Sequence, residues 1–458
     1  MAKELAKNIN RNAGNCMMKK PVKKNEKGGK GARTWSLGAR ITTGIIAVIA
    51  IVIVSVVLRY GLSINNFLDK ITEKTPEKKE YSVVVLDSSA MIKVEDLKDK
   101  NVGFLRIDEK AGNAEQYLSS VAKINAEFYD DVDTLTSVLN GKIVDAIVLE
   151  TDRLEMLKDD ASETVKNTRV IYTFEIEIES ENVEVAEKEV TEEPFVVYIS
   201  GSDSRTGIKT TARSDVNIIA VVNPVKGKIL LVSIPRDTYV QLHGTTGIKD
   251  KLTHAGVYGI NMSKATIEDF LGINIDYTVK VGFDTVVKVV DQIDGIEIDS
   301  DQAMSLSADG GKCEYVVGKQ QVDGRCALRF ARERKSYTSG DRHRGENQMQ
   351  VITAILAKLS SSRNYLLRIP TILDIAADSF ETSFTRDEIS AFIRMQLGGG
   401  INWQTESISV TGAGSMQGTY SMGASRPLYV MIADQVSVDN ATAKINEYLS
   451  SGNELPEE

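Results

Sequence analysis

The chain has 458 residues, of which 42% are hydrophobic and 26% are charged, as in an ordinary globular protein with two or three domains. The net charge of −9 is unevenly distributed: residues 1–40 contain eleven Lys or Arg and two Glu, so they carry +9 and leave −18 for the rest. The three histidines, His243, His254 and His343, lack the spacing of metal ligands, which argues against a zinc enzyme.

An uncharged segment follows the basic leader. Residues 41–58, ITTGIIAVIAIVIVSVVL, lie between Arg40 and Arg59. A helix of this length spans roughly 27 Å at 1.5 Å per residue, so we predict a transmembrane helix. A cleaved signal peptide is the alternative, but the leader is long and no A-x-A site follows the apolar segment.

The leader also sets the expected orientation in the cell membrane. Positive charge before a span predicts that residues 1–40 form a cytoplasmic tail and that the chain after this single span lies outside. This orientation explains the basic residues without a nucleic-acid-binding arm. No helix-turn-helix pattern is evident in the tail, so we expect that the protein is not a transcription regulator and has no nucleic-acid partner.

A small α/β accessory domain is expected next. After a charged stalk at residues 59–80, short apolar runs alternate with amphipathic stretches over residues 81–179. Two segments, VEDLKDKNVGFL and LNGKIVDAIVLE, resemble one lobe of an extracellular solute-binding protein. A spacer or docking module is an equal alternative, because one lobe cannot close around a ligand. Nine Glu and one Lys in residues 175–193 predict an acidic linker over residues 180–193.

Residues 194–450 again alternate in an α/β pattern. Strands are expected at FVVYI (195–199), VNIIAVV (216–222) and ILLVSI (229–234), and helices near 263–271 and 346–360. The turn NPVKGK joins the second and third strands, which predicts an antiparallel hairpin. The last helix carries one apolar stripe at helical spacing, formed by Ile352, Ile355, Leu356 and Leu359. The pattern predicts a central sheet flanked by helices.

Arginines and aspartates should meet at one edge of this sheet. In the hairpin, ARSD (212–215) enters one strand beside IPRD (234–237), which leaves the next. GSDSR (201–205) joins them if the first strand ends at the same edge. A solvated salt-bridge network is the simplest explanation of such a cluster. Its expected members are Asp203, Arg205, Arg213, Asp215, Arg236 and Asp237.

A second cationic segment favours a ligand instead. Residues 325–348, RCALRFARERKSYTSGDRHRGENQ, contain six arginines but few carboxylates such as Glu333 and Asp341. A phosphorylated ligand would supply both charge and bidentate acceptors. A helix beginning near Arg344 would place free N–H groups toward an anion, with Arg344 and Gln348 on one face. Arginines combined with carboxylates favour a metal-bridged pyrophosphate, whereas Arg325 and Arg329 are expected to be solvated.

These segments resemble the LytR-CpsA-Psr family of Gram-positive cell-wall enzymes. The resemblance runs from about Phe195 to Asn347 and continues more weakly to the C-terminus. Seven ordered motifs carry it: YISGSDSR, RSDVNIIAVVNP, ILLVSIPRDTYV, DKLTHAGVYG, VDQIDGIEI, GKQQVDGRCALRFARER and GDRHRGENQ.

The resemblance implies a phosphotransferase. Such an enzyme takes an anionic glycopolymer from a polyprenyl-pyrophosphate carrier and joins it to peptidoglycan through a phosphodiester. The implied fold is a mixed sheet flanked by helices, with an apolar tunnel for the lipid, and the implied cofactor is Mg²⁺ or Mn²⁺. The implied partners are the carrier-linked glycopolymer, peptidoglycan and the lipid membrane. The alternative is an anchored carrier- or ligand-binding sensory protein without transferase activity.

The resemblance also implies roles for single residues. Asp203 and Asp215 match the metal-associated aspartates. The residues that match the family's pyrophosphate ligands are Arg213, Arg236, Arg332, Arg334, Arg344 and Gln348. We add Arg205 and Arg342 to the expected pyrophosphate-binding set because they lie close to these residues in the sequence. Asp341 matches a further carboxylate, and the expected catalytic set is Asp203, Arg213, Arg236, Asp237 and Asp341. The base for the acceptor hydroxyl remains open among Asp203, Asp237 and Asp341.

Three further features complete the expectations. The chain departs from the family pattern where it has Asn347 and a single Gln348 after the last arginine. His254 is expected to be a hydrogen-bonded structural residue. An extracellular compartment permits a disulfide between Cys313 and Cys326, whose pairing the sequence leaves open.

Overall fold

The computed structural model describes residues 77–450, except 160–163, 179–187, 203–206, 309, 338–339, 363, 366–367, 369–370, 373–374, 376–378 and 399–400. The predicted tail and transmembrane helix, with most of the stalk and the acidic linker, lie outside the described residues. Within the described part of the chain, no helix is long and apolar enough to cross a membrane.

The first described elements form the expected small α/β domain, called here the accessory domain. They are β1 (Glu77–Leu86), η1 (Val94–Leu97), β2 (Asn101–Leu105), α2 (Ala111–Ala122), β3 (Asn125–Tyr129), α3 (Val132–Asn140), β4 (Ala146–Glu150), α4 (Thr151–Asp159) and β5 (Thr168–Ile178). The strand order is β3-β2-β4-β1-β5. Strand β1 runs antiparallel to both neighbours and begins inside the residues expected for the stalk.

Helix α4 follows β4 without an intervening loop. A helix that starts directly after the last residue of a buried strand is held close to the end of the sheet. Leu154, Met156 and Leu157 pack into the apolar cluster on one face of this sheet. The polar residues of the first turn of α4, Asp152 and Arg153, are therefore fixed at the rim of the domain.

A six-stranded mixed sheet organises the second domain, called here the catalytic domain because it contains the segments for which the sequence predicts the active site. Its strands are β6 (Phe195–Ser202), β7 (Ser214–Asn223), β8 (Lys228–Ser233), β11 (Tyr277–Gly282), β16 (Phe380–Thr382) and β17 (Gln404–Ser409). The order is β16-β11-β6-β7-β8-β17. Strands β6, β7 and β8 are antiparallel to one another, and β11 is antiparallel to β16, whereas β11 runs parallel to β6 and β17 runs parallel to β8. The predicted hairpin and mixed sheet are confirmed.

Smaller elements complete the catalytic domain. They are β9 (Tyr239–Val240), β10 (Asp250–Lys251), α5 (Leu252–Ala255), η2 (Gly256–Tyr258), α6 (Ile260–Leu271), α7 (Phe283–Gln292), β12 (Ile296–Ser300), β13 (Met304–Ala308), β14 (Gly311–Tyr315), β15 (Gly318–Val322), α8 (Gly324–Ala331), α9 (Asp341–Ser361), α11 (Arg386–Gly398), β18 (Gly412–Thr419), β19 (Gly423–Ala433) and α12 (Gln435–Ser450).

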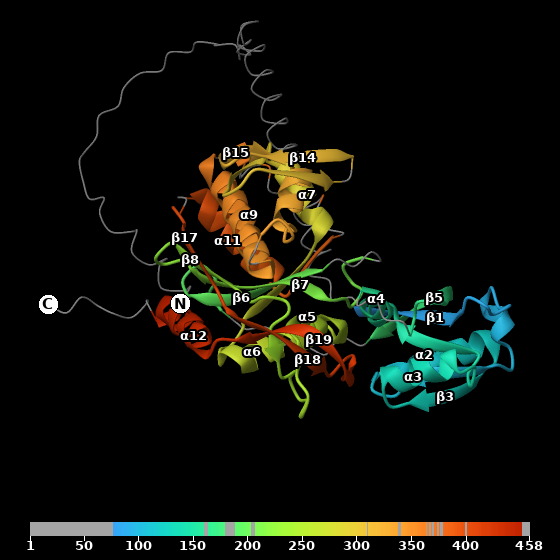
Figure 1. Cartoon of the computed structure of the whole chain (residues 1–458). Helices are drawn as coiled ribbons and strands as arrows, with labels where there is room; N and C mark the ends of the chain where they lie inside the picture. Colours follow the sequence, from blue (N-terminus) through green and yellow to red (C-terminus); the bar gives the residue numbers. More distant parts are fainter. Residues whose placement is uncertain are drawn as a thin grey trace, which may run out of the picture. The chain divides into compact units, whose positions relative to one another are not determined.

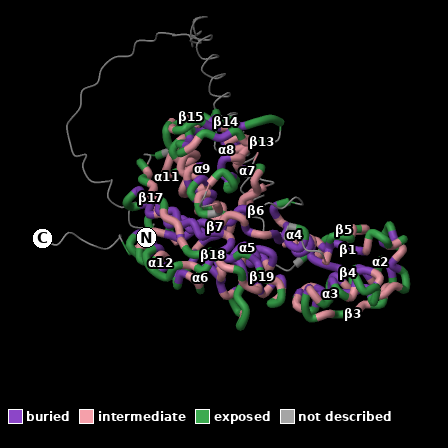
Figure 2. The backbone as a smooth tube through the Cα atoms, viewed as in Figure 1, coloured by how far each residue is buried: buried purple, intermediate pink, exposed green. Residues whose placement is uncertain are grey.

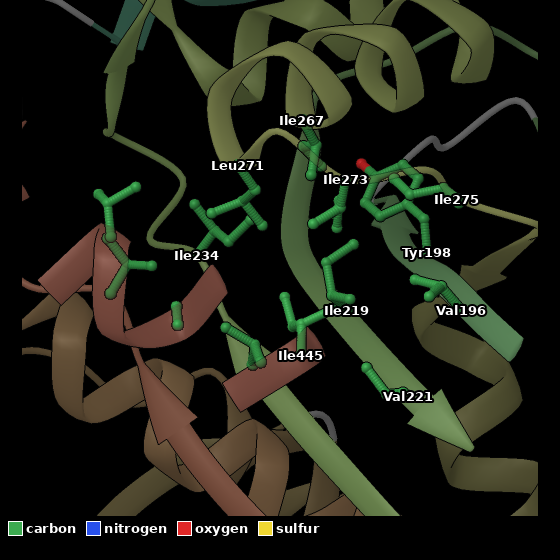
Figure 3. Packing of buried hydrophobic residues seen from close by; sticks show 14 of the residues in the cluster. Val196, Tyr198, Ile219, Val221, Ile234, Ile267, Leu271, Ile273, Ile275 and Ile445 are labelled. Carbon is green, nitrogen blue, oxygen red and sulfur yellow. The ribbon is translucent and has the colours of Figure 1, made fainter. Parts of the chain in front are cut away.

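Helices cover both faces of the six-stranded sheet (Figure 1). Alternate residues of β7 point to opposite sides: Ile219 and Val221 pack with α6 and α12, and Ile218 and Ala220 pack with α9 and α11. A sheet covered on both faces needs continuous apolar strands, which explains runs such as VNIIAVV. Figure 2 shows these strands as buried, and Figure 3 shows the packing on the α6 and α12 side.

Helix α9 differs from its prediction in two ways. It begins at Asp341, several residues before the expected start near Arg344. Its expected single apolar stripe serves two clusters: Ile352 and Leu356 pack against the sheet, whereas Ile355 and Leu359 pack against the elements around α8. The expected core packing of these four residues is confirmed, but they divide between two apolar layers because α9 lies between them.

A disulfide joins the β13–β14 hairpin to α8. Cys313 and Cys326 are bonded, with their Cα atoms 5.5 Å apart. Asp323 caps the start of α8 by accepting a hydrogen bond from the Cys326 N–H at 2.8 Å. Both interactions fix the helix that leads into Arg332 and Arg334.

Candidate active site

Three chain segments converge at one edge of the six-stranded sheet, as predicted. Ser202 at the end of β6 pairs with Ser214 at the start of β7, and Ser233 at the end of β8 pairs with Ile218. Arg236 Nη1 donates to Asp215 Oδ1 at 2.5 Å across this edge. The other two members expected from the first segment, Asp203 and Arg205, lie outside the described residues.

A hollow of about 500 Å³ opens beside this edge, and we call it the arginine pocket. Among the described residues that line it, six are Lys or Arg and two are Asp. Such an excess of positive charge in a concave site favours an anion with several oxygen acceptors. The described lining residues are Met156, Arg213, Asp215, Arg236, Asp237, Lys251, His254, Phe283, Arg332, Arg334, Arg344, Gln348 and Tyr429.

Arg332 and Arg334 reach the pocket from the end of α8. The Arg332 guanidinium lies over the Phe283 ring, 4.6 Å from its centroid, which orients the cation. Glu333, between them, is buried and accepts from Arg329 Nη2 at 2.6 Å. Glu333, the carboxylate nearest to Arg332 and Arg334 in the sequence, is thus paired with Arg329. As expected, Arg329 does not line the pocket.

Arg344 enters the pocket from the first turn of α9 and is only 8% exposed. Its N–H donates to the Gly340 carbonyl at 3.2 Å, so the predicted free N–H at this residue was wrong. The close approach of α9 to the sheet requires Gly345, because a Cβ there would lie 2.5 Å from Ser233 Oγ. Gln348 lies one turn further along and lines the same pocket.

Two other predicted residues of α9 are not placed in the arginine pocket. Arg342 lines a separate hollow of about 730 Å³ between α9 and β17, where its Nε lies 3.8 Å from Glu346. Among the described residues that line that hollow, three are acidic and two are basic, so it does not favour an anion. Asp341 begins α9, but its side chain lies outside the description.

Asn347, where the family pattern differs, has a structural role. Its side chain is buried and donates to the Phe330 carbonyl at the end of α8 at 3.1 Å. This hydrogen bond links the two helices that supply Arg332, Arg334 and Arg344. Asn347 therefore helps to hold the pocket together without lining it.

The segment DKLTHA supplies two pocket residues that the sequence reasoning missed. Lys251 Nζ lies 3.3 Å from Asp237 Oδ1. His254, expected to be structural, does hydrogen bond through Nδ1 to Asp250 Oδ1 at 2.6 Å, but it also lines the pocket. Burial alone would raise the pKa of Asp250, but His254 and hydrogen bonds from Ser421 and the Lys251 N–H lower it below its usual value. The spacing of Asp250 and His254, four residues apart, was the available signal.

The accessory domain also contributes to the site. Met156 of α4 lines the pocket, and Asp152 Oδ2 accepts from the Arg213 N–H at 2.5 Å. Burial is the main cause that raises the pKa of Asp152 to about 6; the charge and the backbone N–H of Arg213 oppose this shift, and Glu150 and Asp215 add to it. No feature of the sequence relates α4 to an arginine segment nearly two hundred residues away.

The two domains share an apolar cluster. Val257, Met422 and Leu428 of the catalytic domain pack with residues of α3 and α4. A shared apolar interface argues against free motion between the domains. The accessory domain therefore belongs to the framework of the site.

The arginine pocket contains a carboxylate that could hold a metal ion. Asp215 lines the pocket and offers the hard carboxylate oxygen that Mg²⁺ prefers, and Mg²⁺ often binds through one or two carboxylates together with substrate phosphates. In the described part of the chain, no group of three or more His, Cys, Asp or Glu could hold a metal. A metal held by Asp215 would therefore have to take its other ligands from a phosphorylated ligand and water.

The fold and the pocket define an α/β protein with a cationic hollow at one edge of its mixed sheet. The sequence model of the LytR_cpsA_psr family matches residues 157–437, which is more than half of the chain. The chain belongs to this family.

Characterised relatives carry a more specific name. The chain is 34% identical over 199 residues to the polyisoprenyl-teichoic acid–peptidoglycan teichoic acid transferase TagU of Enterococcus faecalis, which covers 43% of this chain and 64% of that protein. The TagU proteins of Bacillus anthracis and Bacillus subtilis are 31% and 35% identical, over 49% and 44% of this chain and 72% and 65% of their own lengths. The chain thus spans slightly less than two thirds of two of these relatives.

A solved structure is also similar. Bacillus subtilis TagV is 29% identical, with a TM-score of 0.48, and the match covers 56% of this chain and 98% of that one.

Proposed function

We propose that the protein is a phosphotransferase that moves an anionic glycopolymer from a polyprenyl-pyrophosphate carrier to peptidoglycan. The arginine pocket carries this proposal, because six described cationic residues and two aspartates line one small hollow. Membership of the LytR_cpsA_psr family and the names of the TagU relatives support the same chemistry. Teichoic acid is the glycopolymer in those relatives' names.

The reaction exchanges a phosphoanhydride bond of the pyrophosphate for a phosphoester bond to peptidoglycan. A hydroxyl oxygen of peptidoglycan attacks the phosphorus that bears the glycopolymer, and the bond from that phosphorus to the bridging oxygen breaks. Polyprenyl phosphate leaves with the bonding electrons, and the hydroxyl proton passes to a base. Little covalent catalysis is required, so positioning and charge neutralisation are the main tasks of the protein.

The pocket residues suit these tasks. Arg332, Arg334 and Arg344 approach from two helices and can bind different phosphate oxygens, while Arg236 is oriented by Asp215. Preorganised cations of this kind stabilise charge that develops on the leaving phosphate. Among the described lining residues, the groups able to take the proton from the attacking hydroxyl are Asp215, Asp237 and His254.

We also propose Mg²⁺ or Mn²⁺ as the cofactor, held by Asp215 and Asp203. When bound, such an ion neutralises negative charge on the pyrophosphate. Asp203 and Arg205 follow β6, whose end lies at the sheet edge beside Asp215, which supports their assignment to the same site.

We further propose that residues 41–58 anchor the protein in the cell membrane with the pocket outside, where peptidoglycan is found. Reporter fusions test this topology. A fusion at Lys30 should report cytoplasm and one at Lys70 the exterior. Lys79 is unsuitable as a fusion point because it is buried in β1. The opposite pattern of reporter signals would contradict the enzymatic proposal as well.

The activity is tested with the purified full-length protein, a polyprenyl-pyrophosphate-linked glycopolymer and peptidoglycan in the presence of Mg²⁺. The expected result is glycopolymer covalently bound to peptidoglycan together with released polyprenyl phosphate. Binding of the carrier without transfer would support the alternative, an anchored carrier-binding sensory protein. Loss of activity after chelation, restored by Mg²⁺, is expected from the proposed cofactor.

A further inference from the structure

The accessory domain contacts the segment of the arginine pocket that contains Arg213 and Asp215. We propose that its helix α4 is a working part of the transferase site, in which Asp152 is a positioning residue that fixes the Arg213–Asp215 backbone. This inference rests on the proposed function and extends it, because it assigns the accessory domain a task in the reaction.

The backbone that Asp152 holds has an irregular geometry. Gly201 pairs with Val216 and Ser202 pairs with Ser214, so Asp215 is the extra residue of a β-bulge. Bulges near active sites re-aim side chains, and here the bulge directs Asp215 into the pocket. The Arg213 N–H next to this bulge donates to Asp152 of the accessory domain, at 2.5 Å.

Asp152 is itself held rigidly. The next residue, Arg153, is fully buried, and its Nε donates to Glu150 Oε2 at 2.7 Å. Its Nη1 donates to the Ser421 carbonyl and its Nη2 lies 3.4 Å from Tyr258 Oη, so the first turn of α4 is bonded to the catalytic domain on two sides. A carboxylate on such a support can fix its partner's position, as residues that orient catalytic groups must.

The chain offers a matched control for Asp152. Asp133 of α3 also crosses between the domains: its Oδ1 accepts from Arg426 Nη2 at 2.7 Å, and its Oδ2 accepts from Ser425 Oγ. Asp133 does not line the arginine pocket. A merely adhesive accessory domain would respond equally to loss of either carboxylate, whereas a domain that positions the site would respond only to loss of Asp152.

The experiment compares full-length Asp152→Ala, Asp152→Asn and Asp133→Ala proteins. Each is assayed for glycopolymer transfer and for binding of geranylgeranyl pyrophosphate, and thermal melting checks the fold. We expect Asp152→Ala to lower transfer by about 10- to 100-fold, the effect of a small misplacement of catalytic groups. Asp152→Asn, which keeps an oxygen acceptor for the Arg213 N–H, should remain within a few-fold of the parent. Asp133→Ala should match the parent.

The outcomes are distinguishable. Equal transfer rates in Asp152→Ala and Asp133→Ala, or equal losses in Asp152→Ala and Asp152→Asn, would overturn the positioning role. A parent protein that neither binds the prenyl pyrophosphate nor transfers glycopolymer would instead contradict the proposed function. If Asp152→Ala fails to fold, Asp152→Ser replaces it, because the shorter side chain cannot reach the Arg213 N–H from the same position.

Discussion

Two clusters of charged residues lie close to the contact between the domains, and they differ in burial and in charge balance. The first, called here the interface cluster, consists of Lys79, Asp108, Glu150 and Arg153, with side chains at most 6% exposed. Lys79 Nζ lies 2.9 Å from Asp108 Oδ1 and also contacts Glu150, which accepts from Arg153. The arginine pocket instead has six cations and two aspartates among its described lining residues.

The difference in charge balance distinguishes structural arginines from arginines that are available to a ligand. Two cations and two carboxylates in the interface cluster satisfy one another, so this cluster needs no ligand. The excess of cations in the pocket is costly unless solvent or an anion compensates it. The number of nearby carboxylates, which only the folded chain reveals, separates a structural arginine such as Arg153 from an arginine such as Arg334, for which we propose a role in ligand binding.

The largest expected effect is on stability, at Arg153. The Arg153→Ala change leaves Glu150 buried beside Lys79 without its second cation, and loss of one partner of a buried ion pair costs about 3–5 kcal/mol. Denaturant unfolding should show this decrease in the free energy of unfolding. Arg106→Ala, which removes an exposed pair with Asp130, is the control and should change stability by less than about 1 kcal/mol. Equal effects of the two changes would contradict the comparison.

The disulfide gives the next largest effect and acts on the pocket side alone. Replacing Cys313 and Cys326 with Ser should lower stability by about 3 kcal/mol in the chain-entropy model and loosen the helix that supplies Arg332 and Arg334. Transfer should fall with it. Cys16→Ser should leave the melting temperature and activity unchanged. Both thiols reacting with an alkylating reagent in the untreated native protein would show that the bond is absent.

Removal of single pocket arginines should affect binding more than stability. Arg332→Ala and Arg334→Ala should weaken binding of the pyrophosphate or transfer by about 10- to 150-fold, because a hydrogen bond to a charged group contributes roughly 1.5–3 kcal/mol. Both residues are exposed, so the variants should melt normally.

Helix α9 provides an internal test of the same prediction. Arg344→Ala should show the loss, whereas Arg342→Ala, two residues earlier but facing the other hollow, should keep parental activity. Normal binding and transfer by all of Arg332→Ala, Arg334→Ala and Arg344→Ala would mean that the pocket is only a solvated surface. Loss of transfer in Arg342→Ala would restore the original expectation for that residue.

The smallest effect concerns pH and the interface cluster. Burial alone would raise the pKa of Glu150, but the charges of Arg153 and Lys79 lower it to about 2, while the pKa of its neighbour Asp108 is raised by burial and by Glu150. A carboxyl with a lowered pKa stabilises the fold while ionised and loses this contribution as pH falls. The stability advantage of the parent over Glu150→Gln should therefore be full above about pH 4.5 and shrink toward pH 2.

Unfolding in denaturant at pH 7, 4 and 3 measures this change. Glu155→Gln, on the exposed side of α4, is the control, and its small difference from the parent should not follow the same trend. A difference between the parent and Glu150→Gln that grows on acidification would show that Glu150 is not held ionised by its cations.

Local sequence patterns were sufficient for much of the catalytic domain. The turn NPVKGK set the β7–β8 hairpin, and the hairpin placed Asp215 beside Arg236 because antiparallel strands bring one end beside the next start. The alternation of elements predicted the accessory domain in the same way. These predictions depend on neighbours in the chain, for which spacing is informative.

Errors arose where distant segments decide the outcome. Arg342 and Arg344 are equivalent in composition, but the earlier start of α9 and the close approach at Gly345 direct only Arg344 into the pocket. The apolar residues expected on α9 do pack into the core, but the sequence did not reveal that two separate layers share them.

The sequence by itself determined the domain order, the sheet edge and the presence of surplus arginine, because strand periodicity, turn residues and charge are local properties. Only the tertiary structure decided which arginines are compensated, and that α4 of the accessory domain reaches Arg213 through Asp152. The physical reason is that burial and charge pairing act through space: Arg153 and Ser421 are 268 positions apart in the chain but joined by a hydrogen bond in the fold.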